Sequence, residues 1–274
     1  MKRIVTLTLL LLLSVFQWGT LFAEDPPGQV AVSPAMFELN IGSKPVNESI
    51  RIKNLKKNPV TLKVEVYNWT LDEQNKLKIL PPDSQSLDQW MIINPVSFTI
   101  DPGNEQVIRF SIRPRTLPNP GEHRAVIYFA EQLSPTNPGG VEILFKLGVG
   151  VYGYAEKIQR AASLQGVSLD RASGTLKVDI QNSGNVHTRL KGEYALWKKD
   201  GFPGFKSIGS YTNWPRDKKR PEWFLGSGSM NNTPVLAGQR RTITTKFDPP
   251  DKNTGYIITV SGTIDGKKIE KILQ

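Results

Sequence analysis

The chain has 274 residues, with 35 Lys and Arg against 25 Asp and Glu, and a formal net charge of +10. It contains no cysteine, which excludes disulfide bonds, thiol catalysis and thiolate metal sites, so its stability depends on packing. The basic excess favours either a nucleic-acid partner or a solvated basic face that attracts acidic partners and envelope surfaces.

The first 23 residues have the composition of a secretory signal peptide. Lys2 and Arg3 precede an apolar run over residues 4–16, which is too short for a stable membrane span, and Ala23 stands before polar residues. We predict export with cleavage after Ala23, no stable membrane insertion afterwards and a remaining charge of +8. Leu21, at the third position before the cut, is larger than this position prefers, so an uncleaved anchor or a shifted cut stays open. For an exported chain we expect no nucleic-acid partner.

The mature chain is expected to fold as short strands separated by turn residues. Asp101, Pro102 and Gly103 form one such turn signal. No segment has a convincing helical period, and the pattern is typical of a β-sandwich. The expected strands are 29–40, with Pro34 marking an edge strand, 49–54, 60–70, 90–93, 96–100, 105–114 and 124–133.

Residues 141–154 form the longest predicted strand. Their apolar residues recur at every second position, which is the period of a strand with one apolar face. Such a strand at the end of a domain either closes its own sandwich or is an edge that pairs with another chain. The apolar residues are Ile143, Phe145, Leu147, Val149 and Val151.

The second half of the chain repeats the first at a constant spacing of 128 residues. Asn54 and Asn182 are predicted to close strands before turns, and Trp69 and Trp197 to pack between sheets. We therefore predict two immunoglobulin-like domains, 24–155 and 156–274, divided near residues 155–162. The other matched pairs are Ile50 and Val178, Ile52 and Ile180, Leu62 and Leu190, Lys63 and Lys191, and Glu65 and Glu193.

Residues 201–232 combine aromatic side chains with a basic run at 216–220. This segment either binds carbohydrate or single-stranded nucleic acid, or forms a long hairpin whose aromatic residues cover one end of the sandwich.

The residue types of common active sites do not assemble into a motif. His123 and His187 each lack a plausible nucleophile nearby in the sequence, and His187 is expected to be a surface residue. No glycine-rich phosphate loop and no metal-ligand spacing is present. We predict a protein that is not an enzyme and needs no cofactor or metal.

Three stretches resemble the periplasmic pilus chaperones of the PapD type. They are Ser33–Phe37 near the first strand, Ile100–Phe110 with the Asp-Pro-Gly turn and Arg109, and Val126–Pro135 before the long strand. The resemblance covers nearly the whole mature chain. It implies a periplasmic protein with two immunoglobulin-like domains, whose partners are pilus or fibre subunits and an outer-membrane usher.

The resemblance also implies a mechanism in which the chaperone lends a strand to an incomplete subunit. The donated strand would be about 141–151, with alternate apolar side chains filling the subunit's groove. The positions that match the family's donated side chains are Val141, Ile143, Phe145 and Leu147, and we predict Val149 as a further partner-binding residue on the same face.

The family anchors the subunit's terminal carboxylate with an arginine on the first strand and a lysine on the donor strand. Met36 and Gly150 stand at these positions, and neither side chain can bind a carboxylate. Lys146, Arg109 and Lys53 are the candidate replacements. The alternative function is a structural or adhesive envelope protein, in which the long strand simply closes its own sandwich.

Overall fold

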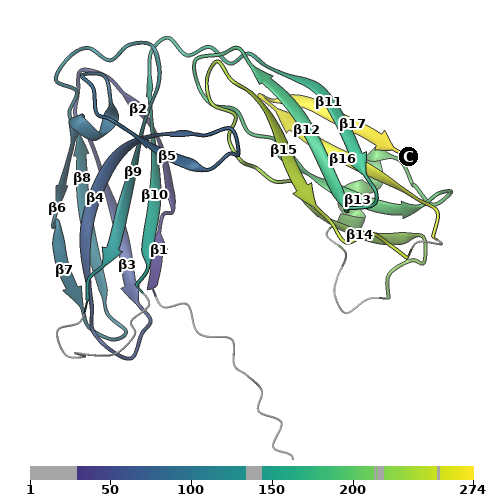
Figure 1. Ribbon diagram of the computed structural model, residues 1–274, viewed down its shortest axis with the longest axis horizontal. Coiled ribbons are helices and arrows are strands. Elements are labelled where there is room, and N and C mark those ends of the chain that lie inside the picture. The colour runs from purple at the N-terminus through teal and green to yellow at the C-terminus, as the bar shows by residue number, and fades with distance from the viewer. Residues whose placement is uncertain (1–29, 134–143, 213, 215–218, 252–253) are drawn as a thin grey trace, which may run out of the picture.

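The computed structural model describes residues 30–133, 144–212, 214, 219–251 and 254–274. Within these ranges the chain is mostly strand with one short α-helix, so the predicted all-β fold class is confirmed. Figure 1 shows two β-sandwiches set at an angle, with a concave side between them. The predicted signal peptide and residues 141–143 lie outside the described residues.

The first sandwich contains two sheets. One sheet has the order β1-β3-β8-β6 and the other β2-β10-β9-β4-β5, with β7 also paired to β4. Side chains that alternate inward, such as Ile50, Leu62 and Phe129, are fully buried between the sheets. The strands are β1 Val30–Ser33, β2 Met36–Ile41, β3 Val46–Asn54, β4 Val60–Leu71, β5 Leu77–Leu80, β6 Met91–Asn94, β7 Ser97–Ile100, β8 Glu105–Ile112, β9 Gly121–Glu131 and β10 Lys146–Ala155, with a 3-10 turn at Leu87–Trp90.

The predicted edge strand at 29–40 is wrong as a single element. It is broken at Pro34 into β1, which pairs with β3, and β2, which pairs with β10 in the opposite sheet. Proline has no N–H to donate to a ladder, so the chain leaves one sheet at this point and joins the other. This crossing decides which part of β10 is covered.

The second sandwich packs a three-stranded sheet, β11-β12-β15, on a four-stranded sheet, β14-β13-β16-β17. Its core includes Val178, Ile180, Leu190 and Val260, all at most 1% exposed. The elements are β11 Ala162–Asp170, β12 Thr175–Asn182, β13 Lys191–Lys198, a 3-10 turn Phe205–Ser207, α2 Ile208–Thr212, β14 Phe224–Ser229, β15 Arg240–Lys246, β16 Tyr256–Ile264 and β17 Lys267–Leu273.

The repeated asparagines have the same hydrogen bonds in both sandwiches. The side-chain amide of Asn54 donates to the main-chain carbonyl of Asn58 at 2.9 Å, and that of Asn182 donates to Val186 at 2.8 Å. The amide oxygen of each accepts from the main-chain N–H two residues later. Both asparagines are fully buried, so each one stabilises the turn that follows its strand.

Replacing Asn54 with alanine is therefore expected to lower the free energy of unfolding by about 1–3 kcal/mol, because buried main-chain groups lose their partners. Urea unfolding followed by tryptophan fluorescence measures this loss. Asn47, exposed on β3, is the control, and its replacement by alanine should change stability by less than about 0.5 kcal/mol. Equal effects of the two variants would contradict the assigned role of Asn54.

The two repeated tryptophans do not pack between sheets, which corrects the prediction. Trp69 lies on the outer face of its sheet in a cluster shared with Val186 and Leu236 of the second sandwich. Trp197 also faces outward, where the segment after β13 covers it. In both strands the side chains that point into the sandwich core belong to the set of alternate positions that does not include the tryptophan. Because successive side chains of a strand alternate between its two faces, the tryptophans point away from the core.

The aromatic segment after β13 covers the outer face of the sheet around Trp197. Tyr211 meets the Trp197 ring edge-on at 5.6 Å and stacks on Trp214 at 5.8 Å. Phe202, Trp223 and Phe224 also lie against Trp197. The described aromatic residues therefore form a packed layer on the sheet, as in the hairpin interpretation, while residues 216–218 of the basic run lie outside the described part.

Candidate partner-binding edge and interdomain cleft

Strand β10 has two neighbouring strands over only part of its length. All of β10 pairs with β9, whereas its parallel pairing with β2 begins at Gly150, opposite Met36. Among the described residues, 146–149 therefore have a neighbour on one side only. A strand with unpaired backbone groups along one side can accept a further strand.

The backbone of this open edge has a defined orientation. The main-chain carbonyl of Phe145 accepts a hydrogen bond from the N–H of Glu131 on the β9 side, at 3.0 Å. Backbone groups of successive residues alternate between the two sides of a strand, so those of Lys146 and Gly148 point to the open side. These two residues carry the hydrogen-bonding groups that an added strand would meet.

The inward-facing side chains of β10 become more buried along the strand. Phe145 and Leu147 are half-buried against the core, whereas Val149 and Val151 are completely buried in it. The sequence predicts Val149 as a partner-binding side chain, but the structure places it in the sandwich's own core, next to the point where β2 closes the sheet. Val141 and Ile143 lie outside the described residues.

The three candidate carboxylate anchors are not brought together. Lys53 on β3 and Arg109 on β8 alternate with the buried Ile52 and Ile108, so both face outward from the sheet opposite to β10. Neither lies at the open edge.

Lys146 lies on the open edge but has a partner. Its Nζ donates to Oε2 of Glu65 at 2.7 Å and lies 4.5 Å from the ring centre of Tyr128. The hydrogen bond from Lys146 lowers the pKa of Glu65, and the same bond raises the pKa of Lys146. An incoming carboxylate would have to compete with Glu65 for this ammonium group.

The two positions without the family's basic residues are neighbours in the structure. Met36 and Gly150 are opposite each other in the β2–β10 ladder, where the open edge ends. A different basic side chain, Arg189 of the second sandwich, reaches this place. Its Nη2 lies 3.5 Å from Sδ of Met36 and donates to the hydroxyl of Tyr152 at 3.0 Å.

Arg189 has no carboxylate partner among the described residues. Its remaining hydrogen bonds go to the main-chain carbonyl of Asn232 at 2.8 Å and to Nε2 of His187 at 3.3 Å. The sequence carries no signal for this residue, because Met36 and Tyr152 lie 153 and 37 residues away along the chain.

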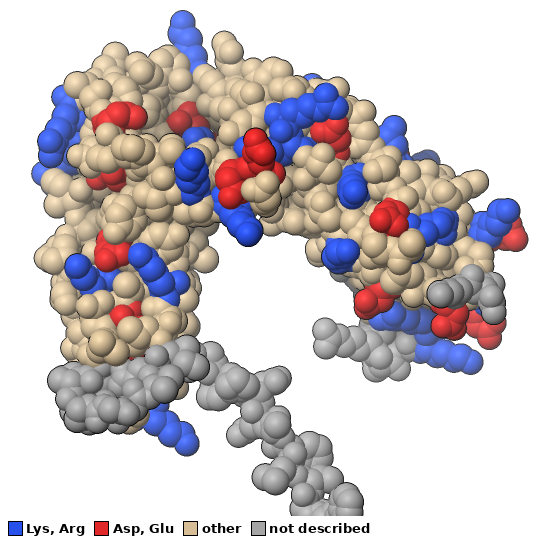
Figure 2. Space-filling view, in the orientation of Figure 1, with Lys and Arg blue, Asp and Glu red and all other residues tan. Residues whose placement is uncertain are grey.

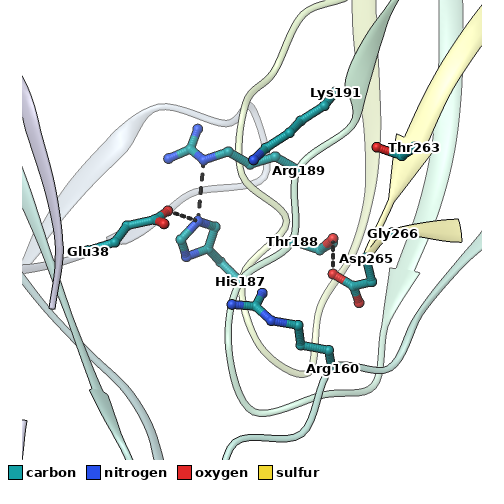
Figure 3. Close-up of a pocket in the computed structure, with 9 residues that line it drawn as sticks. All are labelled: Glu38, Arg160, His187, Thr188, Arg189, Lys191, Thr263, Asp265 and Gly266. Atoms are coloured by element: carbon teal, nitrogen blue, oxygen red, sulfur yellow. Dashed lines mark hydrogen bonds and ion pairs between the residues drawn. The ribbon is translucent and has the colours of Figure 1, made fainter. Parts of the chain in front are cut away.

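Arg189 also lines a hollow of about 330 Å³ at the junction of the sandwiches (Figure 3). Arg160 and Lys191 line it too, and neither forms an ion pair with a described carboxylate. Asp265 is occupied by hydrogen bonds from the Thr188 hydroxyl at 2.7 Å and the Ala162 N–H at 2.9 Å. Glu38 also lines the hollow, with its Oε1 3.5 Å from Nε2 of His187. The hollow therefore has three cationic side chains, Arg160, Arg189 and Lys191, against two carboxylates, an excess that can attract an anion.

Beyond residue 23, the basic charge of the sequence lies in its second half. Residues 156–274 contain 20 Lys and Arg against 11 Asp and Glu, whereas residues 24–155 contain 13 against 14. Figure 2 shows charged side chains of both signs gathered over the bend between the sandwiches.

A buried carboxylate joins the two sandwiches beside this hollow. The side chain of Glu122, on β9, is 0% exposed, and its Oε2 accepts from the main-chain N–H of His187 at 2.8 Å and contacts the ring Nδ1 at 2.5 Å. Its Oε1 accepts from Arg124 at 2.9 Å. His187 is 3% exposed, so the predicted surface location is wrong, because the first sandwich covers it.

Burial alone would raise the pKa of Glu122. The hydrogen bonds from His187 and the charge of Arg124 outweigh this effect and hold the pKa of Glu122 below its usual value. The backbone next to Glu122 also approaches the second sandwich closely. Gly121, at φ +119°, would bring a Cβ atom within 2.7 Å of the Asn185 carbonyl, so glycine permits this approach.

The described residues contain no group of three or more His, Asp or Glu placed to hold a metal ion. No helix among them has the length and apolar composition needed to cross a membrane. What the fold and the site define is an all-β chain of two immunoglobulin-like sandwiches, with an open strand edge that leads into a basic cleft.

Solved structures with a similar arrangement include fimbrial chaperones. The complex of SafA pilin with the SafB chaperone from Salmonella enterica matches with a TM-score of 0.48 and 9% identity, over 91% of this chain and 99% of the other. The YadV chaperone matches with a TM-score of 0.48 and 11% identity, over 89% and 98%. The CsuC–CsuE chaperone–tip subunit complex from Acinetobacter baumannii matches with a TM-score of 0.46 and 13% identity, over 89% and 98%. No protein-family model and no curated protein matches the sequence.

Proposed function

We propose that this protein is a periplasmic chaperone that binds subunits of surface fibres by lending them a strand from β10. The observation that carries the proposal is the open edge at 146–149, which ends where β2 begins. A subunit that lacks one strand of its sandwich would complete its sheet on this edge through main-chain hydrogen bonds. This binding needs no cofactor. An outer-membrane usher would then receive the subunit.

The side chains proposed to enter the subunit continue the inward face of β10 beyond its covered part. Phe145 and Leu147 are half-buried at the open end of the core, and Val141 and Ile143 continue the same alternation. Each large apolar side chain that becomes fully buried in the subunit contributes about 1.5–3 kcal/mol. Val149 is not proposed to contact the subunit, because its side chain belongs to the core and its backbone groups face β9.

Arg189 is proposed to bind the terminal carboxylate of the subunit. It would take the role of the family's arginine and lysine, whose positions are occupied by Met36 and Gly150 in this chain. A strand added at 146–149 and parallel to β10 would end with its carboxylate at Met36, beside the Arg189 guanidinium. An antiparallel strand would place its amino terminus there, and two positive charges would repel each other. The charge of Arg189 therefore favours the parallel orientation.

The edge is tested with Lys146→Pro, compared with Lys146→Ala. Both variants lose the ammonium group, but proline also removes the N–H that points to the open side. The probe is a synthetic peptide of one glutamate, four Thr-Val repeats and a C-terminal phenylalanine, below called the Thr-Val peptide. Titration followed by NMR should show shifts of the Gly148 amide in the wild type and at least about tenfold weaker binding to the proline variant.

The alanine variant is expected to bind the Thr-Val peptide within about threefold of the wild type. If alanine and proline weaken binding equally, Lys146 acts through its ammonium group and not through the edge. If the wild type shows no shift at Gly148, strand donation is contradicted, and the alternative of a structural or adhesive envelope protein gains support. Thermal unfolding of both variants shows whether each remains folded.

A further inference from the structure

An apolar groove of about 350 Å³ opens at the point where the free edge of β10 ends. Its floor is the outer face of the sheet, where Trp69 and Tyr152 are at most 4% exposed. Met36 and Leu77 form its sides and are 42% and 41% exposed. In Figure 1 the hairpin of β4 and β5, which carries Leu77, reaches towards the second sandwich, and Pro234 of that sandwich also lines the groove.

The floor of the groove is open because Gly150 has no side chain. A Cβ atom added there would be 3.5 Å from the Tyr152 ring and 3.9 Å from Cγ of Met36, at ordinary contact distances. Alanine therefore fits at this position, whereas a longer side chain would extend into the groove. The volume suits one large apolar or aromatic side chain.

The groove and the proposed carboxylate anchor lie side by side. Met36 and Tyr152 line the groove, and both contact the guanidinium of Arg189, at 3.5 Å and 3.0 Å. A strand added to the open edge is stopped at Met36 by the start of β2. The last residue of that strand would have its carboxylate at Arg189 and its side chain next to the groove.

We infer that this groove selects the C-terminal residue of the bound polypeptide and prefers a large apolar or aromatic side chain with a free carboxylate. The inference rests on the proposed strand donation and adds the chemistry of the chain end to it. Exposed Met36 and Leu77 supply apolar surface that such a side chain would cover, and the nearby guanidinium requires the negative charge.

Four forms of the Thr-Val peptide test the inference, ending in phenylalanine or alanine and each as free acid or amide. We expect the phenylalanine acid to bind on the order of 30-fold more tightly than the alanine acid. The amides should both bind more weakly than the acids. Gly150→Leu should remove the preference for phenylalanine without weakening the alanine acid, and Gly150→Ala should retain the preference.

Leu77→Ser is a second test of the groove if Gly150→Leu does not fold, because Leu77 lies outside the β2–β10 ladder that contains Gly150. This variant should reduce the preference for phenylalanine several-fold. Equal binding of phenylalanine and alanine acids, with shifts still seen at Gly148, would overturn the groove while leaving strand donation in place. Absence of binding by all four peptides would instead contradict strand donation, and the inference with it.

Discussion

Replacing Glu122 with alanine is expected to lower the free energy of unfolding by about 3–5 kcal/mol, because Arg124 and the main-chain N–H of His187 then lose a buried charged partner. Glu122→Gln should cost less, since its amide oxygen can still accept a hydrogen bond. Urea unfolding of the whole chain measures both. The two sandwiches should also become more variable in relative orientation, which small-angle scattering detects.

Glu105→Ala is the matched control. Glu105 pairs with Arg51 at 2.9 Å, but the two side chains are 50% and 64% exposed, so the free energy of unfolding should fall by at most about 1 kcal/mol.

The difference in unfolding free energy between wild type and Glu122→Ala should also depend on pH. The pKa of Glu122 is depressed in the folded state, so its contribution is complete above the unfolded value of about 4.3 and disappears as the pH falls through the folded pKa. If the unfolding curves of Glu122→Ala and the wild type coincide at neutral pH, the proposed stabilising role of Glu122 between the two sandwiches is refuted.

Replacing Arg189 with glutamine is expected to weaken binding of the Thr-Val peptide acid by about 2–5 kcal/mol, which is roughly 30-fold or more in the dissociation constant. The guanidinium lies 3.5 Å from Sδ of Met36, where the added strand would end, and glutamine preserves polar contacts but not charge. The amide form of the peptide should bind wild type and variant almost equally. NMR titration at low and moderate salt measures the difference.

A rescue variant separates the anchoring charge from a structural role of Arg189. Combining Arg189→Gln with Met36→Arg returns a guanidinium to the same place from strand β2, and we expect it to recover most of the lost affinity. Arg240→Gln is the control, because Arg240 belongs to the same sandwich but pairs with Asp179 on its exposed surface. If the double variant binds as weakly as Arg189→Gln alone, the carboxylate is not held at this position.

The candidate site was only partly predictable from the sequence. Met36 and Gly150 were found as the positions without the family's basic pair, and the structure places them opposite each other in one ladder. Arg189 was missed because its contacts with Met36 and Tyr152 depend on how the second sandwich is set against the first. Local patterns in a sequence carry information about strands and turns, but not about the angle between domains.

The same limit explains the errors on the tryptophans and on His187. Trp69 and Trp197 recur in register, which indicates equivalent strands, yet both face outward and are covered by different neighbours. A buried aromatic residue has the same local pattern whether its cover is the opposite sheet or another domain. His187 has a polar sequence context and becomes buried only because the first sandwich supplies Glu122.

Local sequence patterns are enough to predict the all-β class, the strand alternation and the repeated asparagine turns, because these depend on residues within one or two strands. Pro34, Asn54 and Asn182 mark their breaks and turns through backbone chemistry that holds in any context. Long-range packing sets how much of β10 is open, since this depends on where β2 joins it after leaving the other sheet. It also decided where a cation meets the end of that edge, because Arg189 arrives there from a different domain.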